Sequence, residues 1–288
     1  MESYLTILNK VLTNGTWKDN RTGVKTISIT GAMFEHDMSL GFPLLTTKKM
    51  ASRTMKVELE GFIKGVTDKK WFQERNCHIW DQWCNPQKVP YGTDNETKKK
   101  MFEERDLGPI YGFQWRHFDA EYQNYDSDYT GKGIDQLANV IMTLKNNPND
   151  RRMIVSAWNP KQLHRMALPP CHYSWQILTH DGKLDLIWQQ RSVDTPLGLP
   201  FNIASYGLLL HLIAKEAGLK ERTLVGQLGD VHIYENQLQG VKEQLTRTPL
   251  KLPKVSTRDF KSLFDWTSDQ TEFPEYQSHP KIEFSLAV

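Results

Sequence analysis

Hydrophobic positions recur along this chain at two different spacings, and together they predict a mixed α and β fold. The first segment places four aliphatic side chains on one helical face: Leu5, Leu8, Val11 and Leu12. Ser3 lies where a helix cap is expected, and Gly15 lies where this helix should end. A second set has the same helical spacing and stops at the polar sequence 146–148: Leu137, Val140, Ile141 and Leu144.

Extended segments follow the second helix. The sequence MIVSAWN at 153–159 predicts a buried strand. The segments 173–179 and 183–192 flank three turn-forming residues, so we expect a hairpin there. These turn residues are His180, Asp181 and Gly182.

The C-terminal part of the chain combines a long helix with one further extended segment. The helix runs through LLLHLIAKEAGL and is expected to end at Gly218, whereas residues 281–288 alternate apolar and polar side chains as a strand does. Residues 85–105 and 119–133 are polar and lack periodicity, so we expect surface insertions there. Because no linker or repeat interrupts the chain, the sequence predicts one α/β (α+β) domain that covers residues 1–288.

Composition and charge narrow the class of protein. Of the 288 residues, 39% are hydrophobic and 24% are charged, which is typical of a globular protein with a substantial core. The net charge is only +2 and no long basic run occurs, so nucleic acid is not an expected partner. The start, MESYLTILNKVL, has neither a signal peptide pattern nor an apolar run near the ~20 residues that span a membrane. Three cysteines, an odd number, predict free thiols and a reducing cytoplasm, that of a bacterium or of a phage-infected cell.

Signatures of several enzyme classes are absent from the sequence. It contains no GxxxxGK[ST] for nucleoside triphosphates, no HExxH for zinc and no GxSxG for a serine nucleophile. The spacing of Cys77, His78 and Cys84 matches no paired zinc motif. We therefore expect these three residues to pack in the core, and we expect no metal.

The sequence LPPCHYSW places Cys171 in a setting that favours reactivity. Two prolines restrict the backbone before it, and three arginines could stabilise a thiolate or bind a phosphate: Arg151, Arg152 and Arg191. A lone cysteine more often fills a core, and NDRR also fits a solvated turn. Arg191 ends an apolar strand, where a buried charge would require an anionic partner.

Three neutral polar side chains add to the candidate chemistry: Asn202, His232 and Tyr234. They lie on apolar segments, where a satisfied core hydrogen bond is the alternative explanation. An amide carries a donor and an acceptor side by side, which suits the edge of a pyrimidine base.

Nine segments resemble the thymidylate synthase family, in family order, from residue 20 to the C-terminus. They are RTGVKTISITG, GFPLLTTKK, HIWDQW, LGPIYGFQWR, RRMIVSAWNP, LPPCH, QRSVD, LGLPFNIASY and GDVHIYENQ. The resemblance implies a single domain whose large mixed sheet packs against the same sheet of a second subunit in a homodimer. It also implies a methyltransferase that converts dUMP to dTMP with 5,10-methylenetetrahydrofolate as co-substrate.

The resemblance assigns a role to each candidate residue. Cys171 would add to C6 of dUMP, and Glu58 would relay protons through water in a network shaped by Tyr111 and His172. The nucleotide is expected to contact Arg21, Arg191, Ser192, Asn202, His232 and Tyr234, joined by Arg151 and Arg152 from the other subunit. The folate is expected to contact Trp80, Trp83, Leu168, Asp194, Leu197, Gly198, Phe201 and the terminal carboxylate of Val288. Asp194, which is also expected to take part in catalysis, would accept a hydrogen bond from the pterin.

Departures from the family pattern leave alternatives open. Glu60 and Gly61 stand where many members have Leu and Trp, and Thr195 and Pro196 are also unusual. A wetter cavity would favour hydration of an exocyclic methylene intermediate, so the alternative is a dUMP hydroxymethylase that releases tetrahydrofolate. Relatives that act on dCMP carry aspartate in place of Asn202, which predicts dUMP as the substrate here. A non-catalytic, RNA-binding homologue is the third alternative.

Overall fold

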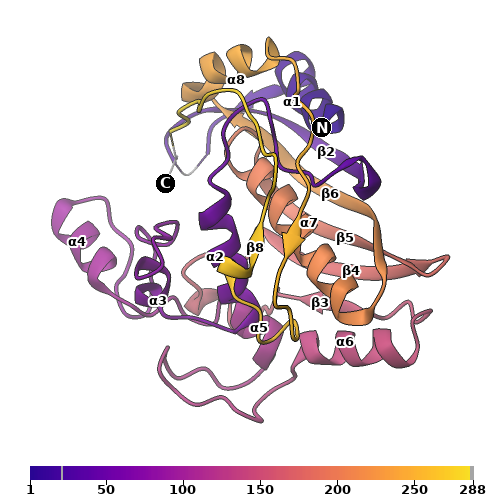
Figure 1. Cartoon of the computed structure of the whole chain (residues 1–288). Helices are drawn as coiled ribbons and strands as arrows, with labels where there is room; N and C mark the ends of the chain where they lie inside the picture. The colour runs from indigo at the N-terminus through magenta and orange to yellow at the C-terminus, as the bar shows by residue number, and fades with distance from the viewer. Residues whose placement is uncertain (21, 286–288) are drawn as a thin grey trace. The chain divides into compact units, whose positions relative to one another are not determined.

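The computed structural model describes residues 1–20 and 22–285, which contain both helices and strands (Figure 1). The strands are β1 (Thr16–Lys18), β2 (Thr26–Asp37), β3 (Ile154–Ser156), β4 (His172–His180), β5 (Lys183–Asp194), β6 (Lys220–Tyr234), β7 (Ser256–Thr257) and β8 (Thr271–Glu272). The helices are α1 (Glu2–Asn14), α2 (Ser52–Ile63), α3 (Lys69–Gln73), α4 (Asn95–Glu103), α5 (Tyr111–His117), α6 (Gln136–Asn146), α7 (Gly198–Ala217) and α8 (Leu238–Leu245). Short 3-10 helices are η1 (Met38–Leu40), η2 (Leu163–Arg165), η3 (Glu235–Gln237) and η4 (Ser268–Gln270). The predicted mixed class is confirmed.

Strands β1 to β6 form one mixed sheet in the order β1-β2-β6-β5-β4-β3. Strand β2 pairs antiparallel with β6, from Thr26↔Tyr234 to Asp37↔Thr223, whereas β5 and β6 pair in parallel. A parallel pair needs a crossover connection, and α7 provides it between β5 and β6. The predicted large mixed sheet is confirmed, while the homodimer stays a prediction.

Packing divides the chain into two compact units. The first unit comprises Met1–Ser52, Thr179–Arg258 and Thr271–Val288, and the second comprises Arg53–Leu178 and Asp259–Gln270. Each unit draws on separate stretches of the chain, so no single position in the sequence divides them. The prediction of one domain over residues 1–288 stays a prediction.

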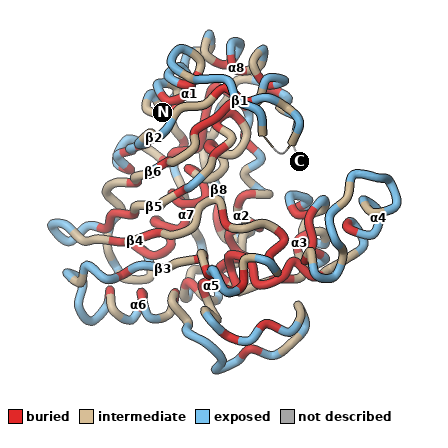
Figure 2. The backbone as a smooth tube through the Cα atoms, turned by 180° about the vertical axis from the view of Figure 1, so that it is seen from behind, coloured by how far each residue is buried: buried red, intermediate tan, exposed pale blue. Residues whose placement is uncertain are grey.

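The core of the first unit forms where α7 packs on β5 and β6. Most of α7 is buried (Figure 2), because its sequence is apolar on nearly every side. Trp188 of β5 stacks on Tyr206 of α7 with ring centroids 5.2 Å apart. Gly226 of β6 makes room for this pair, since a Cβ there would lie 2.3 Å from the Trp188 ring. Gly218 ends α7 in the left-handed conformation, with φ of 67°, as predicted.

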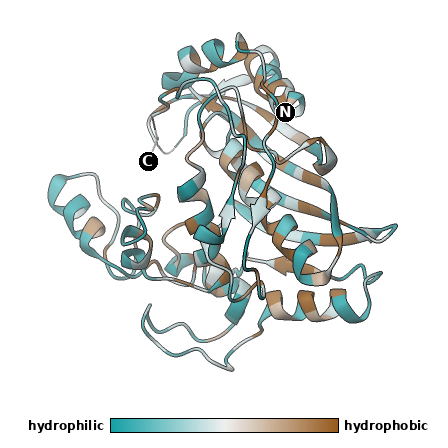
Figure 3. Ribbon diagram, viewed as in Figure 1, coloured by the Kyte–Doolittle hydropathy of each residue, from teal (hydrophilic) through white to brown (hydrophobic). Residues whose placement is uncertain are grey.

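The second unit is built on α2, in which every residue from 57 to 63 is buried. Gly112 allows α5 to approach α2, since a Cβ there would lie 2.8 Å from the carbonyl oxygen of Phe62. Helix α6 packs on α5 and β3 through the predicted face: Leu137, Val140, Ile141 and Leu144. Helix α4, in contrast, is hydrophilic along most of its length (Figure 3).

Helix α1 begins earlier than the sequence predicts. Its N-cap is Met1, and Ser3 lies inside the helix, where its hydroxyl accepts a hydrogen bond from the Glu35 backbone N–H at 3.3 Å. The predicted cap at Ser3 is therefore wrong, whereas Gly15 ends the helix as predicted. The buried face is Tyr4, Ile7, Leu8 and Val11, with Leu5 and Leu12 half-buried beside it.

The two predicted surface insertions contain buried residues. Helix α4 lies within 85–105 and buries Met101. In 119–133, Tyr122 and Tyr129 are buried in one cluster with Phe113 and Ala120. The Tyr122 hydroxyl donates to Asp106 at 2.6 Å, which satisfies its polar end inside the protein. The expectation that these insertions lie outside the core is therefore wrong in part.

The extended segments also differ from the sequence pattern. Strand β3 covers only part of 153–159, and Ile154 is 50% exposed, so the predicted buried strand is shorter. The predicted turn is present at Asp181 and Gly182, whose φ angles are 51° and 69°. Residues 281–285 form no strand, although Ile282 is buried, and the remainder of that predicted strand lies outside the described residues. No helix in the described part of the chain is long and apolar enough to cross a membrane.

Candidate active site

Cys171 lies where the chain enters β4, directly after the Pro-Pro pair. Its side chain is half-buried, and its backbone N–H donates a hydrogen bond to the Tyr111 hydroxyl at 2.8 Å. Cys77 and Cys84 are fully buried, and burial raises the pKa of their thiols to about 12 and about 11. Because a nucleophile must be reachable and ionisable, Cys171 is the candidate among the three cysteines.

Aromatic rings pack around the side chain that follows Cys171. The His172 ring stacks on Tyr111 with centroids 4.3 Å apart and planes at 25°. Phe62 also stacks on Tyr111, at 4.8 Å and 20°, and Trp80 meets Tyr111 edge-on at 6.2 Å. Burial lowers the pKa of His172 to about 3, so this imidazole is neutral at physiological pH. It therefore offers a hydrogen-bonding group and not a cation.

Glu58 lies on α2 and is only 6% exposed, because the buried run of α2 gives its carboxyl little access to water. Burial raises the pKa of Glu58 to about 8, and the Trp80 indole offsets this only in part. A carboxyl with this pKa can take up and release a proton near neutral pH. Trp80, the residue that offsets the Glu58 shift, meets Tyr111 edge-on, and Tyr111 bonds to the Cys171 backbone, so these residues belong to one neighbourhood of the second unit.

Asp194 ends β5 in the first unit, and two donors hold its carboxylate. Oδ1 accepts from the Leu197 backbone N–H at 3.0 Å, and Oδ2 accepts from Gln237 Nε2 at 2.8 Å. Burial raises the pKa of Asp194, and these two hydrogen bonds act in the opposite direction. The charge of Lys48 acts in that direction too, and Lys48 Nζ donates to the Pro196 carbonyl at 2.6 Å. Burial lowers the pKa of Lys48 to about 8.

Asn202 lies on the first turns of α7, and Gln190 of β5 orients its amide. Gln190 Nε2 donates to Asn202 Oδ1 at 3.0 Å, while Gln190 Oε1 accepts from the Trp188 indole at 3.1 Å. The chain of bonds from Trp188 through Gln190 fixes which end of the Asn202 amide is the oxygen. This orientation comes from β5 and cannot be deduced from the sequence around Asn202.

His232 and Tyr234 lie near the end of β6. His232 Nδ1 is 2.9 Å from Asp230 Oδ1, and its ring meets the Tyr234 ring at 87° with centroids 5.2 Å apart. Asp230 also forms an ion pair with Lys18 of β1. Asp230, through its carboxylate, and Tyr234, through its ring, therefore both hold the His232 ring in position.

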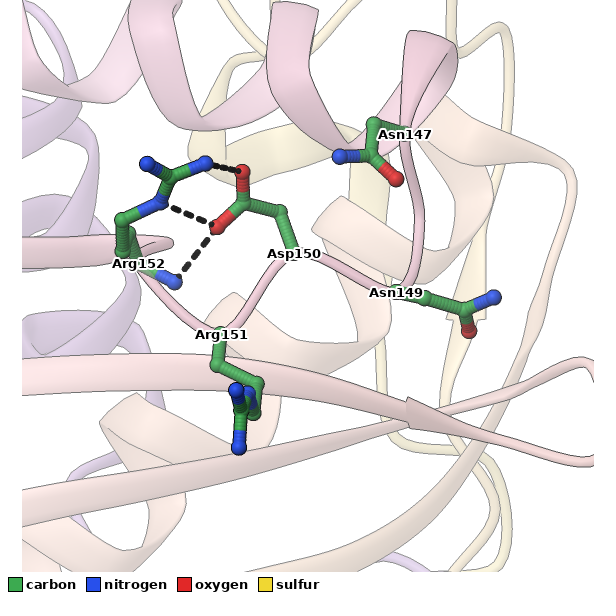
Figure 4. A pocket seen from close by; sticks show the side chains of 5 residues that line it. All are labelled: Asn147, Asn149, Asp150, Arg151 and Arg152. Atoms are coloured by element: carbon green, nitrogen blue, oxygen red, sulfur yellow. Dashed lines mark hydrogen bonds and ion pairs between the residues drawn. The ribbon is translucent and has the colours of Figure 1, made fainter.

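Three arginines predicted to bind phosphate are exposed: Arg151, Arg152 and Arg191. Arg191 lies at an exposed position of β5, so the argument that its burial requires an anion is wrong. Arg152 donates to Asp150 at 2.9 and 2.7 Å, and Arg151 extends away from this pair (Figure 4). The loop lines a surface pocket of about 410 Å³ with Asn147, Asn149, Asp150, Arg151 and Arg152. Solvent weakens an exposed pair such as Arg152–Asp150, so Arg152 can exchange its partner for another anion.

The remaining predicted residues are divided between the two units. Those in the first unit lie near the end of β5 and at the start of α7: Ser192, Leu197, Gly198 and Phe201. In the second unit, Trp80 and Trp83 are buried after α3, and Leu168 is half-buried just before the prolines. Arg21 and Val288 lie outside the described residues.

Within each unit the structure brings several predicted residues together. The group in the second unit is Glu58, Trp80, Tyr111, Cys171 and His172. In the first unit, Asp194 lies beside His232 on paired strands, and Asn202 is tied to β5 through Gln190. Sequence reasoning misses Lys48, Gln190 and Gln237, because a single Lys or Gln carries no local signal of its partner. Among the residues that the structure describes, no three His, Cys, Asp or Glu side chains are grouped to hold a metal ion.

Known proteins resemble this chain over nearly its whole length. The family model described as "Thymidylate synthase" matches residues 2–288. The chain is 44% identical over 292 residues to a bifunctional dihydrofolate reductase-thymidylate synthase of Paramecium tetraurelia, covering 99% of this chain and 61% of that protein. It is 42% identical over 286 residues to a bifunctional dihydrofolate reductase-thymidylate synthase of Zea mays, covering 99% and 54%. A putative enzyme of the same description from Oryza sativa subsp. japonica is also 42% identical, with 99% and 57% covered.

The chain thus spans between 54% and 61% of the length of these relatives. All three organisms are eukaryotes, so the relatives give no support to a bacterial or phage source. Their names contain no hydroxymethylase.

Proposed function

The chain belongs to the thymidylate synthase family, and from this premise we propose that it methylates C5 of dUMP with 5,10-methylenetetrahydrofolate as co-substrate. The products are dTMP and dihydrofolate. The names of the relatives support this reaction and give no support to the hydroxymethylase alternative.

The observation that carries the proposal is that the buried carboxyl of Glu58 and the half-buried Cys171 belong to one group of neighbouring residues in the second unit. Cys171 supplies the nucleophile that adds to C6 of the pyrimidine, which makes C5 electron-rich. Glu58, with a pKa of about 8, supplies a group that moves the C5 proton through water. Tyr111 fixes the Cys171 backbone, and neutral His172 stacks on the same ring.

The folate supplies one carbon at the methylene level and then the hydride that reduces it to a methyl group. A pterin is flat and carries N–H donors, and the residues present fit both properties. Trp80 and Trp83 offer buried aromatic surface, and Asp194 offers a carboxylate acceptor held in place by two donors. The other proposed folate contacts are Leu168, Leu197, Gly198, Phe201 and the carboxylate of Val288.

The nucleotide is held by its phosphate, sugar and base. Arg21, Arg191 and Ser192 bind the phosphate, together with Arg151 and Arg152 of the second subunit of a homodimer. The exposure of Arg151 and Arg152 supports this role, since an exposed guanidinium can reach another chain. Asn202 binds the uracil edge, and His232 and Tyr234 bind the sugar hydroxyl.

The test is to incubate the purified protein with dUMP and 5,10-methylenetetrahydrofolate and to identify the nucleotide by mass spectrometry. Appearance of dTMP together with the absorbance of dihydrofolate supports the proposal. Formation of 5-hydroxymethyl-dUMP without dihydrofolate would instead establish a hydroxymethylase, and absence of both products would refute catalysis. Cys171→Ser should abolish turnover while dUMP binding persists, and faster turnover of dCMP than of dUMP would refute the assigned base.

A further inference from the structure

Gln237 lies at the end of η3, where its side chain meets three segments of the first unit. The residue is 1% exposed, and its amide makes three hydrogen bonds. Oε1 accepts from the Tyr234 backbone N–H at 3.0 Å. Nε2 donates to Asp194 Oδ2 at 2.8 Å and to the Ser285 carbonyl at 3.2 Å. Because the oxygen and both N–H hydrogens are engaged, the amide has one fixed orientation.

The C-terminal segment 282–285 packs closely on the same region. At Gly240 of α8, an added Cβ would lie 2.8 Å from the Phe284 ring and 2.9 Å from the Ile282 side chain. Lys48 Nζ lies 4.7 Å from the centroid of the Phe284 ring. The segment is thus held by apolar contact, by a cation over an aromatic ring and by the Gln237 amide.

Two polar side chains, those of Lys48 and Gln237, therefore contact both the region at the end of β5 and the C-terminal segment. Lys48 donates to the Pro196 carbonyl, two residues beyond Asp194, and lies over Phe284. Gln237 bonds to Asp194 and to Ser285. Of these two side chains, Gln237 is the one that hydrogen-bonds to both the carboxylate and the segment through a single amide.

We propose that Gln237 is a positioning residue of the folate site, which orients the Asp194 carboxylate and couples it to the C-terminal segment through one amide. This inference rests on the proposed function, because it takes Asp194 as the acceptor for the pterin. The coupling is reciprocal: folate that binds Asp194 favours the docked segment, and docking of the segment favours the Asp194 orientation that folate needs.

The charges around Asp194 give the coupling a measurable signature. Lys48 faces the carboxylate from the segment before α2, His232 from β6 and Tyr4 from α1. Burial raises the pKa of Asp194, and the Gln237 hydrogen bond is the first of the interactions that lower it. Removing that bond raises the pKa further. The carboxylate then becomes protonated, and unable to accept from two pterin donors, at a higher pH.

The experiment compares Gln237→Glu and Gln237→Leu with the matched control Gln244→Leu in the full chain. Gln244 is also a buried amide in this region, but it donates to Thr47 Oγ1 at 3.0 Å. Gln237→Glu retains an acceptor for the Tyr234 N–H and replaces the neutral donor by a carboxyl that must share a proton with Asp194, so it keeps the backbone contact at Tyr234 that the Leu variant loses. Measured quantities are KM for folate, KM for dUMP, the pH profile of kcat/KM for folate, and hydrogen exchange of residues 281–285.

For both Gln237 variants we expect KM for folate to rise at least tenfold and KM for dUMP to change less than twofold. In Gln237→Leu the acid limb of the profile should move up by about one pH unit. Exchange of 281–285 should become faster, and Gln244→Leu should show none of these changes. Equal changes in both KM values, an unmoved acid limb, or unchanged exchange at 281–285 would overturn the proposal. If the wild-type protein makes no dTMP, the proposed function fails, while the exchange measurement still decides whether Gln237 holds the segment.

Discussion

The hydroxyl of Tyr111 accepts a hydrogen bond from the backbone N–H of Cys171 at 2.8 Å. This bond joins the first turn of α5 to the residue that precedes β4, within the second unit. The Tyr111 ring is itself held by Phe62 and His172, which stack on it. The position of the Cys171 backbone therefore depends on a hydroxyl that packing keeps in place.

Tyr111→Phe is expected to reduce kcat by roughly 10- to 100-fold, because the Cys171 backbone loses the acceptor that positions its sulfur. Binding of dUMP should change less than threefold, since the ring and its stacking contacts remain. Steady-state kinetics and calorimetric titration with dUMP measure the two effects. Tyr122→Phe is the matched control, because Tyr122 is also buried and bonds to Asp106, away from Cys171. An equal loss of kcat in both variants would contradict a positioning role for Tyr111.

Glu58→Gln is expected to stabilise the protein at alkaline pH while reducing kcat at least 100-fold. The folded pKa is raised from 4.5 to about 8, so the stability that this carboxyl contributes is complete below pH 4.5 and is lost as pH rises through 8. At pH 8.5 the Gln variant should therefore be more stable by about 2 to 4 kcal/mol, with little difference at pH 4.5. Urea unfolding at both pH values measures this.

Glu60→Gln provides the contrast for this measurement. Glu60 lies on the same helix and is also buried, but it pairs with Lys64 at 2.6 Å and accepts from the Ser268 N–H at 2.9 Å. Its replacement should lower stability at pH 7 by about 1 to 3 kcal/mol, because the ion pair is lost. A gain of stability in both variants would show that burial of Glu58 is not the cause.

Gly61→Ala is expected to destabilise the protein by about 1 to 3 kcal/mol through overpacking. A Cβ at this position would lie 2.3 Å from Phe72 Cε1, so the fully buried Phe72 ring occupies the space of a larger side chain. Phe72→Leu frees that space, and the double variant should lose less than the sum of the single losses, by about 1 kcal/mol or more. Additive losses in thermal or urea unfolding would contradict the steric explanation.

Lys69→Met is expected to cost about 3 kcal/mol of stability and to raise KM for folate. Lys69 is 1% exposed, and its ammonium donates to the carbonyls of Trp83 at 2.9 Å and Met101 at 2.5 Å. Faster hydrogen exchange in residues 83–103 should accompany the loss. Lys70→Met is the control, because the exposed pair of Lys70 with Glu74, at 3.8 Å, contributes little. Equal stability of the two variants would contradict a structural role for Lys69.

The sequence predicts helices α6 and α7 well because apolar spacing and capping residues within the helix itself determine where it lies. The buried faces of α6 and the end of α7 at Gly218 follow from the spacing of a few neighbouring residues. Residues 281–285 show that a pattern can be right about burial and wrong about structure. Ile282 is buried as the alternation requires, yet a strand also needs a partner, which the pattern does not supply.

Residue roles that depend on distant contacts are less accessible from the sequence. The apolar neighbours of Arg191 indicate one face of β5, whereas Arg191 itself lies at an exposed position. Lys48 and Gln237 lie in segments that resemble the family, but their contacts with Pro196 and Asp194 appear only in the folded chain. The contacts that orient a candidate residue therefore cannot be read from the segment in which that residue lies.

The pairing of β2 with β6 also has a consequence during synthesis. Strand β2 leaves the ribosome well before its partner residues, from Thr223 to Tyr234, which follow much later in the sequence. At ordinary translation speeds the nascent β2 waits roughly 10 to 40 seconds for that partner. Throughout this delay the backbone groups of β2 that later pair with β6 are open to pairing with other chains, so the order of synthesis exposes this strand edge to aggregation.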